Sequence, residues 1–507
     1  MTRKRWLLPG FCFLAAACFL AVCSRSSFLY PMNDWVDVNA YVTLARAMHA
    51  GKRIYTDIYD QKGPLLYYIY YVLTAFENCY LAEYVLEVVC YGLFLFFAAQ
   101  CAALYAKRAW TPYAVVLALA AVVPASNVFS LGGSVEELCL FMMMHPLYAT
   151  LRAIRRKTFL TGRQALLFGA YAGVILWIKY TMLGFYAGLA LFIAVWFVQA
   201  RRYAALGRVI GCFLAGLAIV SALTVSYFVY HGTLGDLWTA YFYNNIFIYS
   251  DAAAESAGSR IFFVLKAGLK NTLRFARKNP VMAVLLALGA ADCLTFRTDK
   301  KTVSFAEIFA VLLPMAGVAF CSLFLGKDFD YYGMPLAVFA PFGAMLALKS
   351  AERLRLRLRP AVAGVLSTAL FAGALAADVR LSQSTELLLK SRDEMTQYQF
   401  AEIINQVEGA TLLNYGFQDA GFYYAADVVP VNKFYMIMNL PLDEMYAEQV
   451  QCVEEGRTDF VITKGGPLEW MSVDDSNYVC VAQPDEFVYY GNGEYGMNGY
   501  FLYRRKW

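Results

Sequence analysis

The stretch from Arg208 to Tyr230 reads RVIGCFLAGLAIVSALTVSYFVY, and Arg208 is its only charged residue. An α-helix needs about 20 predominantly apolar residues to cross the hydrocarbon core of a membrane. Runs of comparable length and hydropathy recur at Trp6 to Cys23, Ala82 to Tyr105 and Val303 to Leu325. The sequence therefore predicts a helical protein that crosses a membrane several times.

The composition of the whole chain agrees with this prediction. Of 507 residues, 60% are hydrophobic and only 16% are charged, whereas about a quarter of the residues of a soluble domain are charged. This much apolar surface requires a lipid bilayer as a partner. The net charge of +5 follows from basic loops and gives no reason to expect nucleic-acid binding.

Basic residues beside the spans set the expected orientation, because positively charged flanks stay in the cytoplasm. They cluster at Arg3 to Arg5, Lys107 and Arg108, Arg152 to Lys157, Arg201 and Arg202, Arg297 to Lys301, and Lys349 to Arg359. Helices placed between the clusters give about eleven spans, near 6–24, 82–105, 111–126, 136–153, 165–182, 183–200, 208–230, 280–296, 303–325, 334–349 and 361–377. We therefore expect a cytoplasmic N-terminus and an extracytoplasmic C-terminus in the cell membrane.

One segment departs from this rule. Lys266, Lys270, Arg274 and Arg277 recur at helical spacing on the side that the count makes external. Such a basic stripe is typical of a helix that lies on anionic headgroups. A miscounted span is the alternative.

The expected domain organisation is a membrane domain over residues 1–377, with a long first outer loop at 24–80 that carries interfacial helices, and an extracytoplasmic α/β domain over 378–507. In the second domain, hydrophobic patterning predicts helices near 391–408 and 442–455 and strands near 411–414, 459–463, 478–482, 487–490 and 499–504. Cys452 and Cys480 both lie in it. Whether they form a disulfide stays open.

The first outer loop holds two carboxylates at the start of an expected helix. In NDWVDVNAYVTLARAMHAG, Val36, Ala40, Leu44 and Ala47 share a face, and Gly51 suits the end of the helix. Asp34 and Asp37 are three residues apart and would share a face, where desolvation could tune one as a general base. The alternative is that Asn33 or Asp34 caps the helix and Asp37 only complements its dipole.

The same loop continues as YTDIYDQKGPLLYYIYY, from Tyr55 to Tyr71. Asp57, Asp60 and Lys62 precede a Gly-Pro pair and a tyrosine-rich helix. A lysine at the mouth of a membrane cavity suits a phosphate, and the tyrosines suit the headgroup region. The alternative is a turn with a solvated ion pair.

Three further charged residues lie at outer ends of spans. In LGGSVEEL, Ser134 and Glu137 have the spacing of a capping box, which leaves Glu136 either as a catalytic carboxylate or as one that reaches the surface. Lys179, in ILWIKYTM, needs a counter-charge or an anionic ligand. We expect an anionic ligand.

The pattern from Asp37-x-x-x-Tyr41 through Tyr55-x-Asp57-x-x-Asp60-x-Lys62-Gly63-Pro64 resembles the first outer loop of bacterial GT-C membrane glycosyltransferases. These are relatives of the dolichyl-phosphate-mannose protein mannosyltransferases and of the aminoarabinose lipid A transferase. The resemblance implies that Asp37 is the catalytic carboxylate, with Asp34 as the fallback, and that Lys62 contacts the lipid phosphate. The stretch from Gly132 to Glu137 is similar to bacterial members too. Tyr331 and Tyr332 stand where relatives often carry a His-Tyr pair.

The resemblance thus implies a GT-C fold and inverting transfer of a sugar from a polyprenyl-phosphate donor to an unknown acceptor, with Asp37 as general base. Asp34 and Glu136 would assist, and Lys62, Asp57, Asp60, Tyr41, Glu137 and Lys179 would bind substrate. No metal motif is visible in the sequence. A divalent cation held by Asp34, Asp37 and Glu136 stays open, because some relatives use one.

Two other classes of function stay open. A transporter or flippase of lipid-linked sugars would show charged residues or helix breaks near the midplane in repeated halves, and the sequence has no such repeat. A membrane scaffold that displays the outer domain would have no use for an acidic loop. The sequence therefore favours the transferase.

Overall fold

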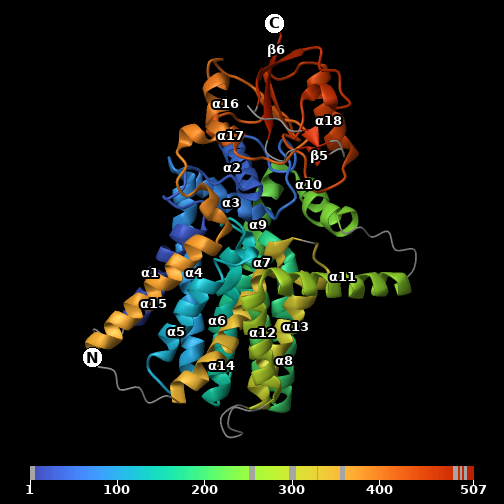
Figure 1. The fold of residues 1–507 in the computed structure, drawn as a ribbon. Coiled ribbons are helices and arrows are strands. Elements are labelled where there is room, and N and C mark those ends of the chain that lie inside the picture. Colours follow the sequence, from blue (N-terminus) through green and yellow to red (C-terminus); the bar gives the residue numbers. More distant parts are fainter. Residues whose placement is uncertain are drawn as a thin grey trace. The chain divides into compact units, whose positions relative to one another are not determined.

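The computed structural model describes residues 6–249, 257–295, 304–327, 329–353, 360–483, 489–490, 494–495 and 499–506. The chain divides into two compact units (Figure 1). Unit 1 comprises Met1–Leu29, Leu81–Thr224 and Ala253–Leu388, and unit 2 comprises Tyr30–Tyr80, Val225–Ala252 and Leu389–Trp507. The basic clusters at 3–5 and 297–301, and residues 354–359 of the cluster that begins at Lys349, lie outside the described residues.

Unit 1 is helical, and every predicted span falls on a helix. Its helices are α1 (Leu7–Cys23), α4 (Cys79–Tyr105), α5 (Thr111–Val122), α6 (Val135–Arg155), α7 (Gly162–Lys179), α8 (Gly184–Gln199), most of α9 (Tyr203–His231), α11 (Ala257–Lys278), α12 (Pro280–Thr295), α13 (Phe305–Ala319), α14 (Ala340–Arg353) and α15 (Pro360–Leu381). Short turns of other helix types join them, among them η3 (Tyr180–Leu183), η5 (Phe320–Phe324) and η6 (Asp330–Phe339).

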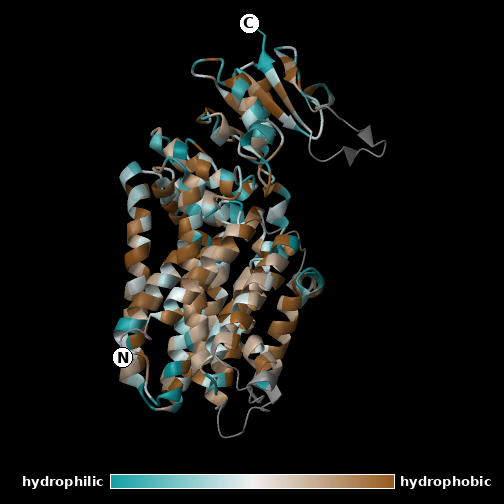
Figure 2. Ribbon diagram, turned by 60° about the vertical axis from the view of Figure 1, so that its left-hand side comes forward, coloured by the Kyte–Doolittle hydropathy of each residue, from teal (hydrophilic) through white to brown (hydrophobic). Residues whose placement is uncertain are grey.

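Several of these helices are suited to a membrane. Among the described residues, six helical stretches are long and apolar enough to cross one: Cys79–Tyr105, Gly162–Gln199, Tyr203–His231, Phe305–Phe324, Asp330–Lys349 and Ala361–Leu381. Figure 2 shows apolar residues along most of their length. Three other predicted spans fall on shorter apolar helices, α1, α5 and α12. The remaining one falls on α6, which carries charged residues in its first and last turns. The chain is a polytopic helical membrane protein.

Small residues allow close helix packing inside unit 1. A Cβ atom added at Gly188 of α8 would come within 2.2 Å of the carbonyl oxygen of Leu313 in α13. Gly317 of α13 faces the backbone of Gly184 in the same way. Lipid supplies no hydrophobic drive between helices, so the van der Waals packing that such close approach allows contributes to their association.

Helix α11 runs crosswise to the neighbouring helices of unit 1 (Figure 1). Its apolar residues Ile261, Phe262 and Leu265 are exposed, as in a helix that lies on a lipid surface. Arg274 of the predicted basic stripe lies 3.4 Å from the carboxylate of Asp330, and Lys278, just beyond the stripe, lies 2.8 Å from it.

Unit 2 contains a four-stranded sheet in the order β1-β2-β6-β3. Its strands are β1 (Leu412–Asn414), β2 (Phe460–Lys464), β3 (Tyr478–Ala482) and β6 (Tyr500–Arg505). Strand β1 pairs with β2 in parallel, and α18 (Asp443–Glu454) lies between them in the chain, whereas the other pairs are antiparallel. The predicted α/β character is confirmed. The strand expected at 487–490 falls partly outside the described residues, of which Tyr489–Tyr490 form β4, paired with β5 (Glu494–Tyr495).

The remaining helices of unit 2 come from three parts of the chain. They are α2 (Val36–His49), α3 (Pro64–Leu73), α10 (Leu234–Leu237), the π-helical η4 (Trp238–Ile248), η8 (Arg392–Glu394), α16 (Thr396–Ile404) and α17 (Phe422–Ala425). Residues 30–80, assigned to the membrane domain by sequence, thus pack with the C-terminal segment.

The predicted amphipathic pattern of α2 is not what the structure shows. The helix forms as expected and Gly51 follows it with φ +87°, but its buried residues surround it: Val38, Asn39, Ala40, Tyr41, Val42, Thr43, Leu44, Ala45 and Ala47. The side expected to face outward is covered by the C-terminal segment, where Asp419 accepts a hydrogen bond from the Thr43 hydroxyl at 2.6 Å.

The two cysteines of the C-terminal domain are both free thiols, so the disulfide left open by the sequence is absent. Cys452 is buried in the core of the domain, among Leu413, Val461 and Tyr503. It serves there as a small apolar residue.

Candidate functional site

In unit 2, the structure brings together Asp37 and Lys62. The ammonium nitrogen of Lys62 lies 3.1 Å from Oδ2 of Asp37, and about one sixth of each side chain is exposed, 15% for Lys62 and 17% for Asp37. The same ammonium lies 5.9 Å from the ring centroid of Tyr41. A carboxylate, an ammonium and an aromatic ring therefore meet at a partly open position.

The local fold fixes both partners of this pair. Asp37 occupies the first turn of α2, where the helix dipole favours a carboxylate. Lys62 ends a tight turn whose backbone is tied at both sides: the Tyr55 hydroxyl donates to the Lys62 carbonyl at 2.5 Å, and the Lys62 N–H donates to the Tyr67 hydroxyl at 3.0 Å. Tyr55 has φ +67°, a rare conformation for a residue with a side chain.

Asp34 does not share a helix face with Asp37, because α2 begins at Val36, two residues after Asp34. The N-cap is Trp35, with no side-chain cap, so neither Asn33 nor Asp34 caps the helix. Asn33 instead accepts a hydrogen bond from the Trp35 N–H at 2.9 Å. Asp34 lies near Lys464, whose pKa is lowered by burial and raised in part by that carboxylate.

The other two acids of the loop have partners of their own. Asp57 accepts three hydrogen bonds from Arg53, at 2.8, 2.9 and 2.8 Å, which lower its pKa to about 2. Asp60 is 3% exposed, and burial raises its pKa while Lys62 opposes the rise. Asp57 therefore fits the alternative of a turn that an ion pair holds together. That Asp57 and Asp60 bind substrate stays a prediction.

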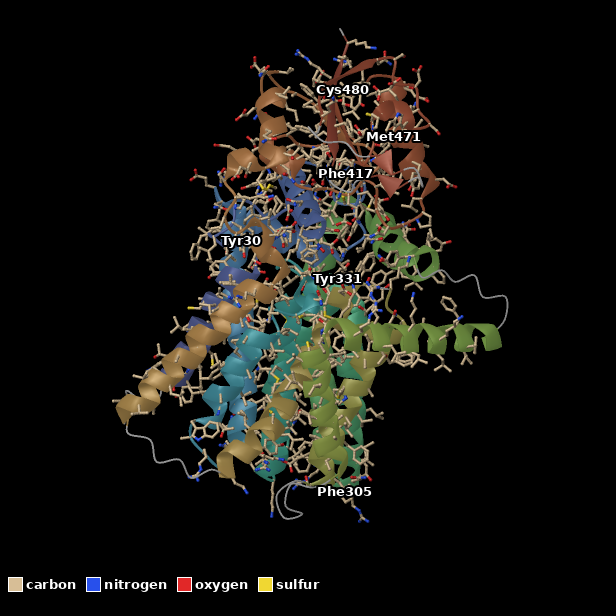
Figure 3. All side chains as sticks on the ribbon, viewed as in Figure 1. Tyr30, Phe305, Tyr331, Phe417, Met471 and Cys480 are labelled. Carbon is tan, nitrogen blue, oxygen red and sulfur yellow. The ribbon has the colours of Figure 1, made fainter. Side chains whose placement is uncertain are left out.

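Unit 1 holds the second cluster, around Lys179. The chain leaves the α-helical conformation at Lys179, with φ −158° and ψ 92°. Its ammonium pairs with Glu136 and lies 3.7 Å from the ring centroid of Tyr332 and 4.9 Å from that of Tyr331, which is labelled in Figure 3. The counter-charge of Lys179 is thus Glu136.

Glu136 is 1% exposed, so the alternative of a carboxylate that reaches the surface is wrong. Ser134 does cap α6, since its hydroxyl oxygen accepts the Glu137 N–H at 3.2 Å. The side chain of Glu137 does not complete the capping box, and it is fully buried.

No family model matches the sequence, and no curated protein matches it. Among solved structures, the crystal structure of ArnT from Cupriavidus metallidurans bound to undecaprenyl phosphate superposes with a TM-score of 0.60 at 13% identity. The match covers 97% of this chain and 98% of that one.

The chain has the ArnT fold. ArnT is an aminoarabinose lipid A transferase with the GT-C fold, so the architecture that the sequence resemblance predicted is confirmed over nearly the whole length. At 13% identity, the likeness establishes the fold, and the roles of individual residues rest on the side chains of this chain.

Two buried acids of this ArnT-fold chain, Glu83 and Glu87, were not anticipated from the sequence. Glu83 and Glu87 of α4 accept hydrogen bonds from Ser26 and Ser24 at 2.7 and 2.6 Å, and Glu137 of α6 lies beside Glu87. Both α4 residues are at most 1% exposed. The signal was present in the sequence, because carboxylates four residues apart inside an apolar 27-residue helix are costly unless they are paired.

The carboxylates offered for a divalent cation do not fit one. Asp37 pairs with Lys62, Glu136 pairs with Lys179, and Asp34 lies near Lys464. Within the described ranges, no three acidic, histidine or cysteine side chains come together as metal ligands.

Proposed function

We propose that this chain is a glycosyltransferase that moves a sugar from a polyprenyl-phosphate carrier to an acceptor, at the extracytoplasmic face of the cytoplasmic membrane. The pairing of Asp37 with Lys62 carries the proposal. It sets a base next to a cation in a chain whose fold matches that of a protein bound to undecaprenyl phosphate. Neither a transporter nor a scaffold requires such a pair.

In the proposed reaction, a carboxylate oxygen of Asp37 takes the proton from the acceptor hydroxyl or amine. The acceptor atom then forms a bond to the anomeric carbon, while the bond between that carbon and the phosphate oxygen breaks. Its electron pair stays on the phosphate, whose charge Lys62 stabilises. Attack from the face opposite the phosphate inverts the anomeric configuration.

The ion pair itself suggests how donor binding and base activation are linked. The Lys62 ammonium lies 3.1 Å from the Asp37 carboxylate and so occupies an oxygen that would otherwise accept the proton of the acceptor. A donor phosphate that binds Lys62 competes with Asp37 for its hydrogens. Donor binding would thereby free Asp37 to accept a proton.

We assign Lys179 of unit 1 to an anionic group as well. Two tyrosine rings already cover its ammonium, as cation–π contacts do for a desolvated cation. An anion would have to displace Glu136 from Lys179, just as a phosphate would displace Asp37 from Lys62. Tyr331 and Tyr332 would then order this lysine in place of a histidine.

The proposal also includes the orientation of the chain in the membrane. The described basic residues Lys107, Arg108, Arg201 and Arg202 lie in turns between helices of unit 1, which suits cytoplasmic loops. We propose that these turns face the cytoplasm and that the C-terminal domain is extracytoplasmic. Labelling of single cysteines by an impermeant maleimide in intact cells would test this.

The test of the function is turnover of polyprenyl-phosphate sugars in proteoliposomes, by the parent chain and by Asp37→Asn, Lys62→Ala and Asp34→Asn. We expect release of polyprenyl phosphate by the parent, a loss of about 10²–10⁴-fold in Asp37→Asn, and near-parental turnover in the Asp34→Asn control. The proposal fails if no donor in a broad panel turns over. It also fails if Asp37→Asn is folded and fully active.

A further inference from the structure

Unit 2 contains a cavity that the proposed reaction does not use. Its volume is about 390 Å³, and it is lined by the end of α2, the turn after α3 and the segment around α16 and α17. This volume is within the roughly 300–1,000 Å³ range of small-molecule sites. Segments that are hundreds of residues apart in sequence therefore form one pocket.

The pocket is distinct from the Asp37–Lys62 pair. Arg46, in the last turn of α2, lines it, whereas Asp37 lies in the first turn. At 1.5 Å per residue, nine residues of helix separate the two by about 13 Å.

Two arginines in the pocket have different roles. Arg46 is held in place, since its guanidinium donates to the Tyr423 carbonyl at 3.1 Å and pairs with Asp427. Arg392 has no carboxylate within ion-pairing distance among the described residues. The pocket therefore carries one cation that is neutralised and one that is available to a ligand.

Each guanidinium lies against a tyrosine ring. Arg46 is 5.8 Å from the ring centroid of Tyr424, and Arg392 is 5.5 Å from that of Tyr398. Phe76, which is 60% exposed, adds a third ring to the lining. A guanidinium ordered by a ring keeps its planar set of donors directed at an oxyanion.

Glu77 adds a hydrogen-bond acceptor to the pocket, where Arg392 provides a cation. It is exposed in the pocket lining and, like Arg392, forms no ion pair among the described residues. A carboxylate accepts hydrogen bonds from hydroxyl groups. The pocket thus combines an available cation, an acceptor for hydroxyls and flat aromatic walls.

We propose that this pocket binds an acidic sugar, that is, a sugar ring that carries a carboxylate or a phosphate. Arg392 binds the anionic group, Glu77 accepts from ring hydroxyls, and the rings of Phe76 and Tyr398 contact the faces of the sugar. This inference concerns binding and does not depend on the proposed transfer reaction. The headgroup of phosphatidylglycerol shares the anion but lacks the hydroxyl-bearing ring.

The test is calorimetric titration of the full-length chain in neutral detergent with glucuronate, glucose 6-phosphate, glucose, inorganic phosphate and short-chain phosphatidylglycerol. We expect saturable binding of the two acidic sugars, at least about tenfold tighter than that of glucose or phosphate. Arg392→Ala should weaken it about tenfold, the effect of one hydrogen-bonded charge. Arg457→Ala, in the same domain, is the matched control and should bind as the parent does, because Arg457 pairs with Glu455 and does not line the pocket.

Arg392 is exposed, so its replacement should leave the fold intact, and Phe76→Ala provides a second variant with an independent contact. The proposal is overturned if neither acidic sugar binds, if glucose binds equally well, or if Arg392→Ala and Phe76→Ala both bind like the parent. Binding of phosphatidylglycerol alone would also overturn it, in favour of a headgroup site.

Discussion

The ammonium of Lys62 lies 3.1 Å from the carboxylate of Asp37, although 25 residues separate the two in sequence. The tight turn that ends at Lys62 folds back onto the first turn of α2 and creates this pair. In the proposed reaction these two groups act at different moments, on the acceptor proton and on the leaving phosphate. Their contact in the resting chain makes them one unit.

A double-mutant cycle tests that unit. We expect Asp37→Asn and Lys62→Met each to lower kcat/KM by about 10²-fold or more. The double variant should be little less active than either single variant, because the effects of two groups that act as a unit are not additive. The measurement is initial rate against donor concentration in proteoliposomes. Losses that simply multiply would show that the two side chains act independently.

The pair of Glu136 and Lys179 makes a prediction about stability. Glu136 is 1% and Lys179 12% exposed, so removal of either partner leaves a buried charge uncompensated. We expect Lys179→Met or Glu136→Gln to lower the free energy of unfolding by about 3 kcal/mol. The double variant should recover most of this loss. Thermal unfolding in detergent measures it, and a double variant less stable than both singles would contradict it.

Asp57 gives a contrasting prediction. Its carboxylate is already occupied by Arg53, and the pair is a surface one, with 42% and 34% of the side chains exposed. Surface pairs contribute little. We expect Asp57→Asn to keep sugar turnover within about twofold of the parent chain, where Asp37→Asn loses about 10²-fold. A loss as large as that of Asp37→Asn would support the role of Asp57 as a substrate ligand.

Asp419 gives a prediction about pH. Burial raises the pKa of its carboxyl from 3.8 to about 6, so the folded chain binds more protons than the unfolded chain between those values. Its contribution to stability is therefore complete below pH 4 and is lost as the pH rises to about 6, by about 3 kcal/mol. Unfolding midpoints of the parent and Asp419→Asn, measured from pH 4 to 7, should diverge in this window. Parallel curves would contradict the assignment.

Much of the membrane architecture could be predicted from the sequence, because the bilayer imposes a length and a hydropathy on each span. Predicted spans such as 208–230 and 303–325 fall on α9 and on α13 with η5. The short strands of the C-terminal domain were also predicted, because the change from a helical to an alternating hydrophobic pattern is visible in a single sequence. What the sequence could not provide was the partner of α2, because its second buried side faces residues more than 370 positions away.

In the candidate site, too, the individual residues could be chosen from the sequence, but their contacts with one another could not. Asp37 and Lys62 were chosen separately, and nothing in their spacing predicted that they touch. Lys179 was expected to need an anion, but Glu136 could not be assigned to it, because the two lie on different helices 43 residues apart. Pocket residues such as Arg392 gave no signal at all, since a single exposed arginine is ordinary until a fold surrounds it.

The hydrogen bond from Thr43 to Asp419 spans 376 residues, and this has a consequence for biogenesis. Ribosomes add about 5–20 residues per second, so α2 waits roughly 20–75 s for the segment that covers it. During that time the outward side of the helix is uncovered, and Thr43 lacks its hydrogen-bond partner Asp419. The newborn chain is therefore most vulnerable to proteolysis and misassembly in the interval between the synthesis of α2 and the synthesis of the segment around Asp419.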